Sequence, residues 1–297
     1  MNVDLAVLTP AYLDYTFVGL EALPGPGEER FAGDMLRSPG GGAITAVGAR
    51  RLGLNTVLVA PLGDDLAGNF VRRELEAEGV IFGEPRGNRT PTTVVMPVAG
   101  ERSMVTVDPG VRARAADLAP LSPRAVAATL EQIDIVPEGV CAFITCGDDD
   151  ARAFAGRLPR VSPTRRARGL IVNRRESEIL TGDSDPEEGA RKLNAVAEIA
   201  AVTLGPDGAV ASHEGRTVHV DGCREAVVDT TGAGDLFAAA LAWGDLLGAD
   251  PEVAVQWANL YAGLSVGAHT GTGGAVTRER LLDEGAQRGL PPLPQRA

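Results

Sequence analysis

Lysine is nearly absent from this sequence. Of the 28 basic side chains in the 297-residue chain, 27 are arginine, and Lys192 is the one lysine. A P-loop needs a lysine for the β- and γ-phosphates, a protein kinase needs one in its third strand, and a pyridoxal phosphate enzyme needs one for its Schiff base. Lys192 stands in none of these contexts. If the protein handles phosphate, it must therefore use backbone N–H groups, a metal ion or arginine.

Cysteines, aromatic residues and long apolar runs are also scarce. Three cysteines without a CxxC pair make no disulfide framework, and an aromatic content of 4% supplies no platform for stacking bases. No apolar stretch reaches the roughly 18 residues of a membrane-spanning helix. A net charge of −12 opposes contact with nucleic acid or anionic lipid. The start of the chain contains Asp4 and no basic region, unlike a signal peptide, so we expect a cytoplasmic protein without nucleic-acid or membrane partners.

The apolar pattern in the first part of the chain alternates between strands and helices. Residues 3–8 and 56–61 are short apolar runs typical of buried strands. Helical patterns that end at a glycine occupy residues 43–52 and 66–78. Because such a succession forms a parallel sheet with helices on both faces, we predict an α/β fold in three layers, α/β/α, around a mostly parallel central sheet.

A β-rich region interrupts this rhythm. Residues 92–98 and 103–107 have the pattern of an antiparallel hairpin, and residues 19–42, rich in glycine and proline, are predicted as loop with short exposed strands. Together they indicate a small β layer beside the body. The remaining pattern predicts helices at 124–132, 149–158 and from 174, strands at 140–146, 169–172 and 200–204, a hairpin at 209–220, and long helices at 233–247 and 252–267.

The strongest local signal is the heptapeptide Asp229-Thr230-Thr231-Gly232-Ala233-Gly234-Asp235, between a loop and a long predicted helix. Small residues let a ligand approach the backbone, and a helix start offers free N–H groups and the positive end of the helix dipole. The pattern therefore predicts an anion site that needs no lysine. Asp235 would lie beside the bound anion, although an acidic residue in a first turn can also be a simple helix cap.

The heptapeptide resembles the second signature of the ribokinase-like (PfkB) carbohydrate kinases. Other motifs resemble that family in the same order, over about residues 3–282. They are Pro39-Gly40-Gly41-Gly42 with Arg51-Leu52-Gly53, Gly63-Asp64-Asp65 with Gly68, Asn173-Arg174-Arg175-Glu176, and Thr203-Leu204-Gly205-Pro206-Asp207-Gly208-Ala209. The resemblance implies a single kinase domain over residues 1–297, with a ribokinase-like three-layer body and a small β-sheet lid formed approximately by residues 12–38 and 89–110.

The resemblance implies a role for each matching residue. Asp235 is the expected catalytic base, and the expected anion hole consists of the N–H groups of Gly232, Ala233 and Gly234. The expected substrate-binding residues are Asp14, Gly40, Gly41 and Asp235. Those expected to border the nucleotide are Asn173, Thr203, Gly205, Gly208 and Asn259. Glu176 is expected to bind Mg²⁺ through water, and Asp229 is a candidate ligand for a monovalent cation such as K⁺.

The resemblance also implies a reaction and partners. The expected enzyme transfers a phosphoryl group from ATP to a primary hydroxyl of a sugar or sugar acid, and its lid is expected to mediate a homodimer. A nucleoside kinase of the same fold and a non-catalytic, regulatory sugar-binding protein are the alternatives. The intact Asp235 and glycine segment favour catalysis, because a degenerate kinase would be free to lose either. Arg102, in the lid hairpin, is a candidate contact for an acidic substrate.

Two features depart from the family pattern. Ile44 stands where relatives often carry an asparagine, and its side chain cannot hydrogen-bond a sugar hydroxyl, so the substrate need not be ribose or fructose. The stretch between residues 158 and 173 is short for the strand and helix usual before Asn173, which indicates that a sheet element is missing or reduced. Neither departure touches the phosphoryl-transfer residues, so both bear on the substrate more than on the reaction.

Other motifs suggest different chemistry. Gly263-Leu264-Ser265-Val266-Gly267 fits the nucleophile elbow of α/β-hydrolases, and His269 follows it. An elbow needs a strand before its serine, whereas the apolar residues here have helical spacing, so we interpret the segment as helix packing. Asp148-Asp149-Asp150 is interpreted as a helix start rather than a metal cluster.

Overall fold

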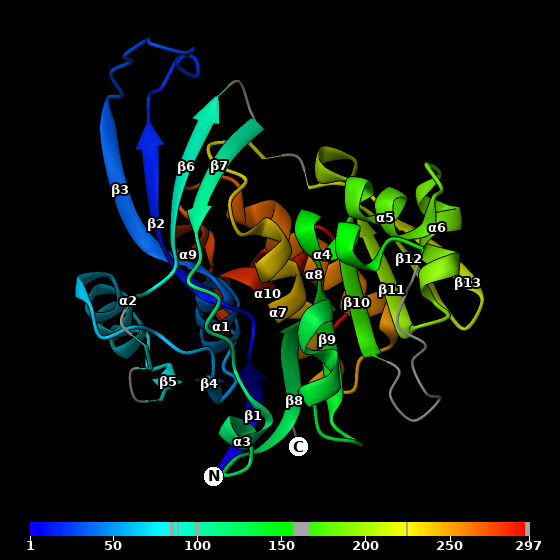
Figure 1. Cartoon of the computed structure of the whole chain (residues 1–297). Helices are drawn as coiled ribbons and strands as arrows, with labels where there is room; N and C mark the ends of the chain where they lie inside the picture. The colour runs from blue at the N-terminus through cyan, green and yellow to red at the C-terminus, as the bar shows by residue number, and fades with distance from the viewer. Residues whose placement is uncertain (84–85, 88, 99–100, 157–166, 224, 295–297) are drawn as a thin grey trace.

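A nine-stranded sheet forms the body of the protein (Figure 1). The computed structural model describes residues 1–83, 86–87, 89–98, 101–156, 167–223 and 225–294. The sheet has the order β13-β12-β11-β10-β9-β8-β1-β4-β5 and is parallel from β5 to β11. Its strands are β1 (Asn2–Val7), β4 (Thr56–Leu58), β5 (Ile81–Phe82), β8 (Ser122–Thr129), β9 (Cys141–Thr145), β10 (Ala167–Asn173), β11 (Ala197–Thr203), β12 (Ala209–His213) and β13 (Arg216–Val220).

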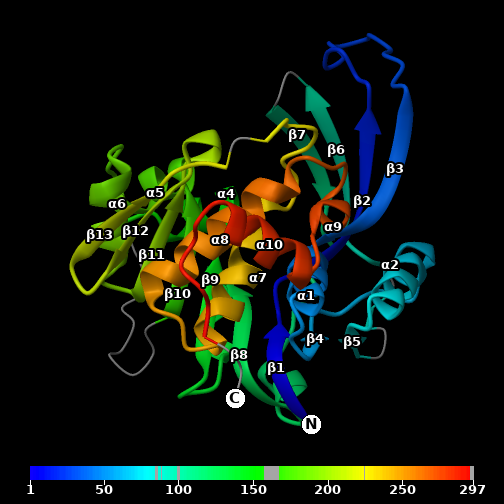
Figure 2. The same ribbon diagram turned by 180° about the vertical axis from the view of Figure 1, so that it is seen from behind.

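Helices cover both faces of this sheet, which confirms the predicted three layers. One face is covered by α1 (Gly42–Arg51), α2 (Leu66–Ala77), α7 (Ala233–Leu246), α8 (Pro251–Ser265) and α10 (Arg278–Gln287), several of which lie in front in Figure 2. The other face carries α3 (Ala115–Leu118), α4 (Asp148–Phe154), α5 (Arg174–Thr181) and α6 (Pro186–Leu193). The strands supply both cores alternately: Leu5 and Val7 belong to the first apolar cluster, and Ala6 and Leu8 to the second. None of the helices in the described ranges is long and apolar enough to cross a membrane.

The prediction of a helix at residues 124–132 is wrong. Residues 122–129 form strand β8, between β1 and β9, and a short 3-10 helix, η1 (Leu130–Ile135), follows. The alanine-rich sequence favours a helix by propensity. In the fold, however, Ala125 and Ala127 pack into one core while Val126 and Ala128 pack into the other. A strand buried on both faces shows no alternation of polar and apolar residues, which is why its sequence did not indicate a strand.

A separate four-stranded sheet, the lid, stands over one end of the body. Its order is β3-β2-β6-β7, with β2 (Ala11–Val18), β3 (Asp34–Gly41), β6 (Thr92–Val98) and β7 (Glu101–Val107). The hairpin of β6 and β7 confirms the antiparallel hairpin predicted for residues 92–98 and 103–107. The short exposed strands predicted within residues 19–42 are instead one eight-residue strand that ends at Gly41 and pairs with β2 along its whole length. Pro39 fits in β3 because β3 is an edge strand, where a missing N–H costs no ladder bond.

The sheet is continuous near the short stretch before Asn173. Strand β10 pairs with β9 on one side and with β11 on the other, both in parallel register. Helix α4, which connects β9 to β10, ends at Phe154 rather than at residue 158. Residues 157–166, where part of that stretch lies, are outside the described residues.

Candidate active site

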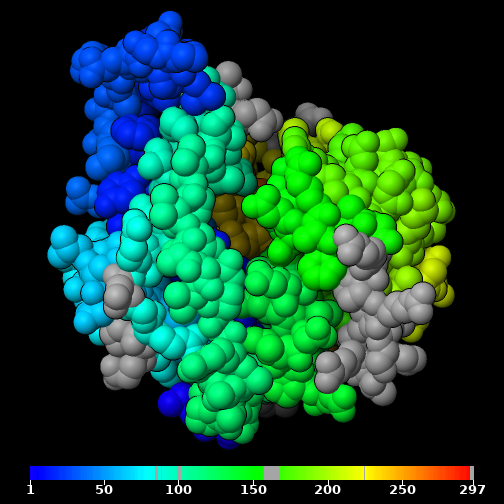
Figure 3. Space-filling view, viewed as in Figure 1, coloured from blue at the N-terminus to red at the C-terminus, as the bar shows by residue number. Residues whose placement is uncertain are grey.

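The start of α7 lies in the cleft between lid and body. Figure 3 shows this hollow between the lid strands and the surface around α4, with residues from the later part of the chain at its floor. Gly232 is the N-cap residue directly before the helix, and it has φ +80°, a left-handed conformation that glycine adopts without strain. A Cβ atom at Gly232 would lie 2.8 Å from Ile44 Cδ1 and 2.9 Å from Gly271 Cα. Both the conformation and the close packing therefore require glycine here.

The first amides of α7 can bind an anion. Among the described residues, the N–H groups of Gly232 and Gly234 have no hydrogen-bond partner, and the N–H of Ala233 makes a long contact of 3.4 Å with the Thr230 carbonyl. The hydroxyl of Thr231 is buried, and in the described part of the chain it has no partner either. Unpaired donors at a helix N-terminus, here those of buried Thr231 and Gly232 and of exposed Gly234, are the groups that an anionic ligand satisfies.

Asp235 lies in the first turn of α7, beside these amides. Its Oδ1 accepts a hydrogen bond of 3.3 Å from the Thr45 hydroxyl of α1. Burial raises the pKa of Asp235 to about 7, while the Thr45 hydrogen bond and the charge of Arg102 act in the opposite direction. A carboxylate that titrates near neutral pH is well matched to accept a proton during catalysis.

Asp14 faces the same cleft from the lid. It lies on β2 and is only 5% exposed, and a Cβ atom at Gly40 of β3 would lie 2.1 Å from its Oδ2. Gly40 therefore makes room for this carboxylate. Burial, and next the negative charge of Asp235, raise the pKa of Asp14 to about 7. Two carboxylates thus approach one another across the cleft, Asp14 from the lid sheet and Asp235 from helix α7 of the body.

The sequence N-x-x-E is a helix capping box. Asn173 ends β10, and its Oδ1 accepts the N–H of Glu176, while Glu176 Oε2 accepts the N–H of Asn173. Glu176 is 8% exposed. Burial raises its pKa to about 7, although the backbone N–H of Asn173 lowers it. The motif therefore fixes a buried carboxylate at the C-terminal edge of the sheet.

The residues expected at the nucleotide lie farther along that edge. Thr203 ends β11, and Gly205 and Gly208 have positive φ angles in the turn before β12. A Cβ atom at Gly208 would lie 2.0 Å from the Val220 carbonyl. Asn259, on α8, donates through Nδ2 to the Asp221 carbonyl at 2.9 Å, so it holds the loop that follows β13.

Asp229 joins two loops below the lid. Its Oδ1 accepts the N–H of Thr231 at 2.8 Å, and its Oδ2 accepts the N–H of Thr270 at 3.0 Å. Thr270 has φ +66°, which is costly for a branched residue, and it caps α9 (Gly271–Gly274). Residues 230–234 form the glycine loop. The Asp229 carboxylate thus holds the glycine loop against the segment at Thr270 and Gly271, and Gly271 packs on Gly232.

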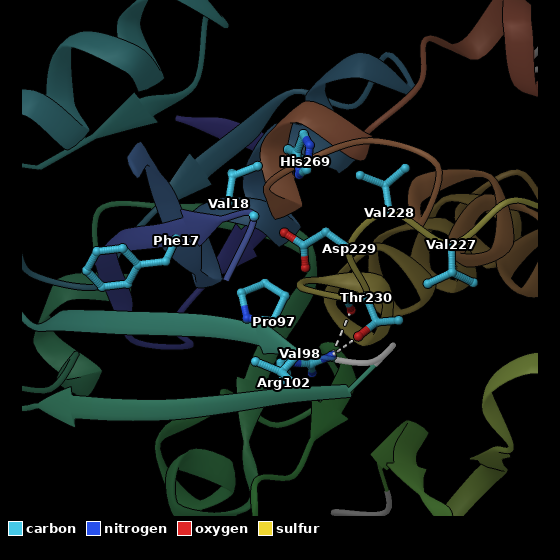
Figure 4. A pocket seen from close by; sticks show the side chains of 11 residues that line it. Phe17, Val18, Pro97, Val98, Arg102, Val227, Val228, Asp229, Thr230 and His269 are labelled. Carbon is cyan, nitrogen blue, oxygen red and sulfur yellow. Dashed lines mark hydrogen bonds between the residues drawn. The ribbon is translucent and has the colours of Figure 1, made fainter. Parts of the chain in front are cut away.

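Arg102 connects the lid to the same loop. From β7 its Nη1 donates to the Thr230 carbonyl at 2.9 Å and to the Thr230 hydroxyl at 2.7 Å (Figure 4). These residues and Asp229 line a pocket of about 180 Å³ whose other walls are largely apolar, including Phe17, Val18, Val98 and Val227. Asp14 and Asp235 do not line this pocket, so it adjoins the cleft that holds the two carboxylates rather than coinciding with it.

Ile44 does not face the cleft as a polar ligand would. It is 1% exposed, and a Cβ atom at Gly271 would lie 2.3 Å from its Cδ1. Ile44 therefore packs between Gly232 and Gly271, beneath the glycine loop. The residue that reaches Asp235 is its neighbour Thr45, which the sequence analysis did not single out. The sequence pattern could have indicated Thr45, because consecutive residues of a helix point in different directions. A buried Ile44 therefore leaves Thr45 on another face of α1.

The hydrolase interpretation is excluded by the local structure. Ser265 is the last residue of α8, and its hydroxyl donates to the Ala262 carbonyl within the helix. The three aspartates at residues 148–150 form the first turn of α4, as predicted.

The acidic residues suit a hydrated divalent cation better than a fully protein-bound one. Within the described ranges, no three acidic, histidine or cysteine side chains converge on one point. Mg²⁺ retains several of its waters when it binds proteins through one or two carboxylates. The buried Glu176, with Asp148 and Asp150 near enough to raise its pKa, fits such a hydrated ion.

The chain is similar in sequence to known proteins. The pfkB family carbohydrate kinase domain matches residues 15–278. The ribokinase of Bacillus subtilis (strain 168) is 30% identical over 276 residues, which cover 87% of this chain and 91% of that protein.

Two solved structures show the same fold. A nucleoside kinase of Burkholderia thailandensis, in complex with inosine, has a TM-score of 0.80 and 17% identity over 98% of this chain and 99% of its own. The ribokinase of Cryptococcus neoformans var. grubii serotype A, in complex with ADP, has a TM-score of 0.76 and 21% identity over 95% and 99%.

Proposed function

The chain belongs to the pfkB family of carbohydrate kinases, and we propose that it transfers the γ-phosphoryl group of ATP to a primary hydroxyl of a sugar or sugar acid. One observation carries this proposal. Asp235 lies in the same helix turn as the free amides at Gly232 and Gly234, so a hydroxyl beside the carboxylate is also beside the anion site. The ADP bound to the similar ribokinase structure supports a nucleotide as donor.

In this proposal Asp235 is the base. It orients the substrate hydroxyl and accepts its proton as the new oxygen–phosphorus bond forms and the bond between the γ-phosphorus and the ADP oxygen breaks. The amides of Gly232, Ala233 and Gly234 stabilise the negative charge on the transferring group. Because burial raises the pKa of Asp235 to about 7, kcat/KM should rise with pH and level off above about pH 7.

The lid side supports a substrate rich in hydroxyl groups. Asp14 is the expected acceptor for them, with the backbone at Gly40 and Gly41 close by. Two further hydroxyls on the cleft-facing side of the lid, those of Thr16 and Ser38, are buried and have no partner among the described residues. Polar groups buried in this way are suited to hydrogen bonds with a polyhydroxylated ligand.

The residues that we assign to the nucleotide and to Mg²⁺ lie along the same edge of the body sheet. We propose that Asn173, Thr203, Gly205, Gly208 and Asn259 border ATP, with Glu176 binding Mg²⁺ through water. When bound, the ion would neutralise part of the phosphate charge. Asp229 would bind a monovalent cation such as K⁺ with the lone pairs that its two amide hydrogen bonds leave free.

We further propose a cytoplasmic homodimer that forms through the lid. The outer face of the lid, opposite Asp14, exposes Met35, Val105 and Val107. Apolar side chains on one sheet face favour burial against a second copy.

A nucleoside kinase is the second candidate. The pocket of about 180 Å³ beside the cleft includes Phe17, Val98 and Val227 in its walls, apolar side chains that can pack against a base. The similar nucleoside kinase structure, which holds inosine, supports keeping this alternative.

The test is ADP release measured over a panel of sugars, sugar acids and nucleosides. We expect one class to stimulate release, and Asp235→Asn to lower kcat on the best substrate by about 10³-fold. Near-wild-type turnover by Asp235→Asn would show that the base is assigned wrongly. If a panel member binds but none stimulates ADP release, the protein is a non-catalytic binding protein.

A further inference from the structure

Asp14 belongs to a row of polar side chains that crosses the whole lid. In the register of the lid sheet, Asp14 of β2 is opposite Ser38 of β3 on one side and opposite Thr93 of β6 on the other. Thr93 is in turn opposite Thr106 of β7, and Figure 1 shows the four strands side by side. Because side chains at paired positions of neighbouring strands point to the same face of a sheet, all four lie on the cleft-facing side.

The two neighbours of Asp14 in this row differ in their hydrogen bonds. The Ser38 hydroxyl is buried and has no partner among the described residues. Thr93 is also buried, but its hydroxyl bonds to the Asp14 carboxylate and lies 3.0 Å from the hydroxyl of Thr106. Within the described part of the chain, the Asp14 carboxylate makes no other hydrogen bond. Thr93 is therefore the described side chain that holds it by a directional bond.

The direction of these hydrogen bonds follows from the number of hydrogens. A threonine hydroxyl donates one hydrogen and can accept two hydrogen bonds, whereas an ionised carboxylate only accepts. Thr93 must therefore donate to ionised Asp14, and Thr106 must donate to Thr93. Thr106 is exposed, so water can satisfy its lone pairs. The bond from Thr93 to Asp14 is thus charge-assisted, the stronger kind of hydrogen bond.

The Asp14 carboxylate is also confined from β3. A Cβ atom at Gly40 would lie 2.1 Å from Oδ2, 2.2 Å from Cγ and 2.3 Å from Oδ1 of Asp14. The whole carboxylate therefore lies directly over the backbone of Gly40. With Gly40 beneath it and Thr93 beside it, one acceptor site of the carboxylate is occupied and the others remain for a ligand.

The charges around Asp14 act on it differently from Thr93. After burial, which is the largest cause, the charges of Asp235 on α7 and of Asp229 before α7 raise the pKa of Asp14, and Arg102 of β7 lowers it. Tyr12, which shares β2 with Asp14, keeps its proton near neutral pH because burial raises its pKa to about 12. A charge acts over a distance without fixing an orientation, whereas a hydrogen bond depends on its angle.

We propose that Thr93 is a positioning residue: it donates to Asp14 and so holds the free acceptor sites of this carboxylate towards the substrate hydroxyls. This inference rests on the proposed kinase function, in which Asp14 is the expected substrate ligand. Thr93 acts on substrate binding through Asp14, and the groups at the start of α7 that serve phosphoryl transfer do not depend on it.

The first experiment needs no substrate. Carbon-13 NMR of the aspartate carboxyl groups, with the Asp14 signal identified by its loss in Asp14→Asn, gives the pKa of Asp14 in each variant. We expect Thr93→Val to raise this pKa by about one pH unit, because the charged form loses a hydrogen bond, and Thr93→Ser to stay within about 0.3 of the wild-type value. The matched control is Thr92→Val, the adjacent threonine on the outer face of β6, which should leave the pKa unchanged.

Kinetics on the panel member that best stimulates ADP release then test the consequence for binding. We expect Thr93→Val to raise the KM of that substrate about 10-fold while kcat stays within about threefold, and Thr93→Ser to restore KM. A loss of kcat at unchanged KM would place Thr93 at the reacting atoms. A higher KM without any change in the pKa of Asp14 would make Thr93 itself a substrate ligand. Either result overturns the proposal.

The outcomes separate this inference from the kinase function. If no panel member stimulates ADP release, the kinase function is overturned, whereas the NMR result still decides whether Thr93 holds the Asp14 carboxylate. If ADP release is normal and the pKa of Asp14 is the same in Thr93→Val and the wild type, only the role of Thr93 is overturned. A cooperative unfolding transition in each variant verifies that it is folded.

Discussion

The two sheets of the molecule differ in how many of their faces are buried. In the body, β1 is buried on both faces, and Leu5, Ala6 and Val7 are each 0% exposed. In the lid, Val95 on the cleft-facing side is 0% exposed, whereas Val105 on the outer side is 62% exposed. A sheet with two cores is rigid because each residue packs. The stability of a sheet with one covered face depends on contacts at its edges and on the surface that packs against its outer face.

The site takes one half from each sheet. The body contributes the amides of α7 and Asp235, held by helix geometry and by the packing of Ile44. The lid contributes Asp14 and Arg102, carried on strands. We therefore expect changes under α7 to reduce both stability and turnover, and changes on the lid to affect substrate affinity, pH dependence or association while the body stays folded.

The largest effect is expected for Gly232→Ala. An alanine at φ +80° is strained, and its Cβ atom would press on Ile44 and on the Gly271 backbone, so we expect a loss of about 3 kcal/mol in the free energy of unfolding and of about 10²–10³-fold in kcat. Denaturant titration and ADP-release assays measure both.

The control is Gly248→Ala, just beyond the other end of the same helix. Gly248 has φ +81° but no atom within 4 Å of a Cβ position, so only the strain of about 1 kcal/mol is expected, with kcat unchanged. Equal losses in the two variants would contradict the role assigned to packing.

Next in size is Ile44→Asn, which introduces the residue that the family resemblance implies at this position. Because Ile44 is buried beneath the glycine loop, the amide would lack partners and leave a packing defect, so we expect a loss of about 2–4 kcal/mol in stability and a lower kcat. Ile44→Val should cost about 1 kcal/mol. A stable Ile44→Asn variant with improved affinity for ribose or fructose would show that this side chain can turn to the substrate.

On the lid, Asp14→Asn should change how stability depends on pH. The folded pKa of Asp14 is raised from 3.8 to about 7, so its charged form opposes folding, and the wild type loses stability as pH rises through this range. The variant should be more stable than the wild type by about 4 kcal/mol at pH 8, and the difference should vanish below about pH 4. Thermal unfolding at several pH values measures it, and a difference independent of pH would refute the assignment.

The smallest effect on folding is expected for Val105→Asp on the outer face of the lid. We expect it to shift a dimer towards monomers in sedimentation experiments while changing monomer stability by less than about 0.5 kcal/mol. Leu66→Asp, at an 89% exposed position on α2, is the control and should leave association unchanged. A dimer that persists in Val105→Asp would place the interface elsewhere.

Much of this arrangement could be read from short-range patterns. The glycines and Asp235 at the start of α7 were predictable because an anion site at a helix start needs consecutive small residues. The lid hairpin was predictable from its alternation. The strand at Ser122–Thr129 was not, because burial on both faces removes the alternation that marks a strand.

The sequence by itself determined the local groups: the small residues before a helix start, the acid in that helix turn, and the absence of lysine from the segment. The tertiary structure decided which distant groups meet there. It placed Thr45 rather than Ile44 at Asp235, brought Asp14 across the cleft, and fixed Arg102 on Thr230, 128 positions away. These long-range contacts depend on how the helices of the body and the two sheets pack against one another, and no spacing within a single segment encodes that packing.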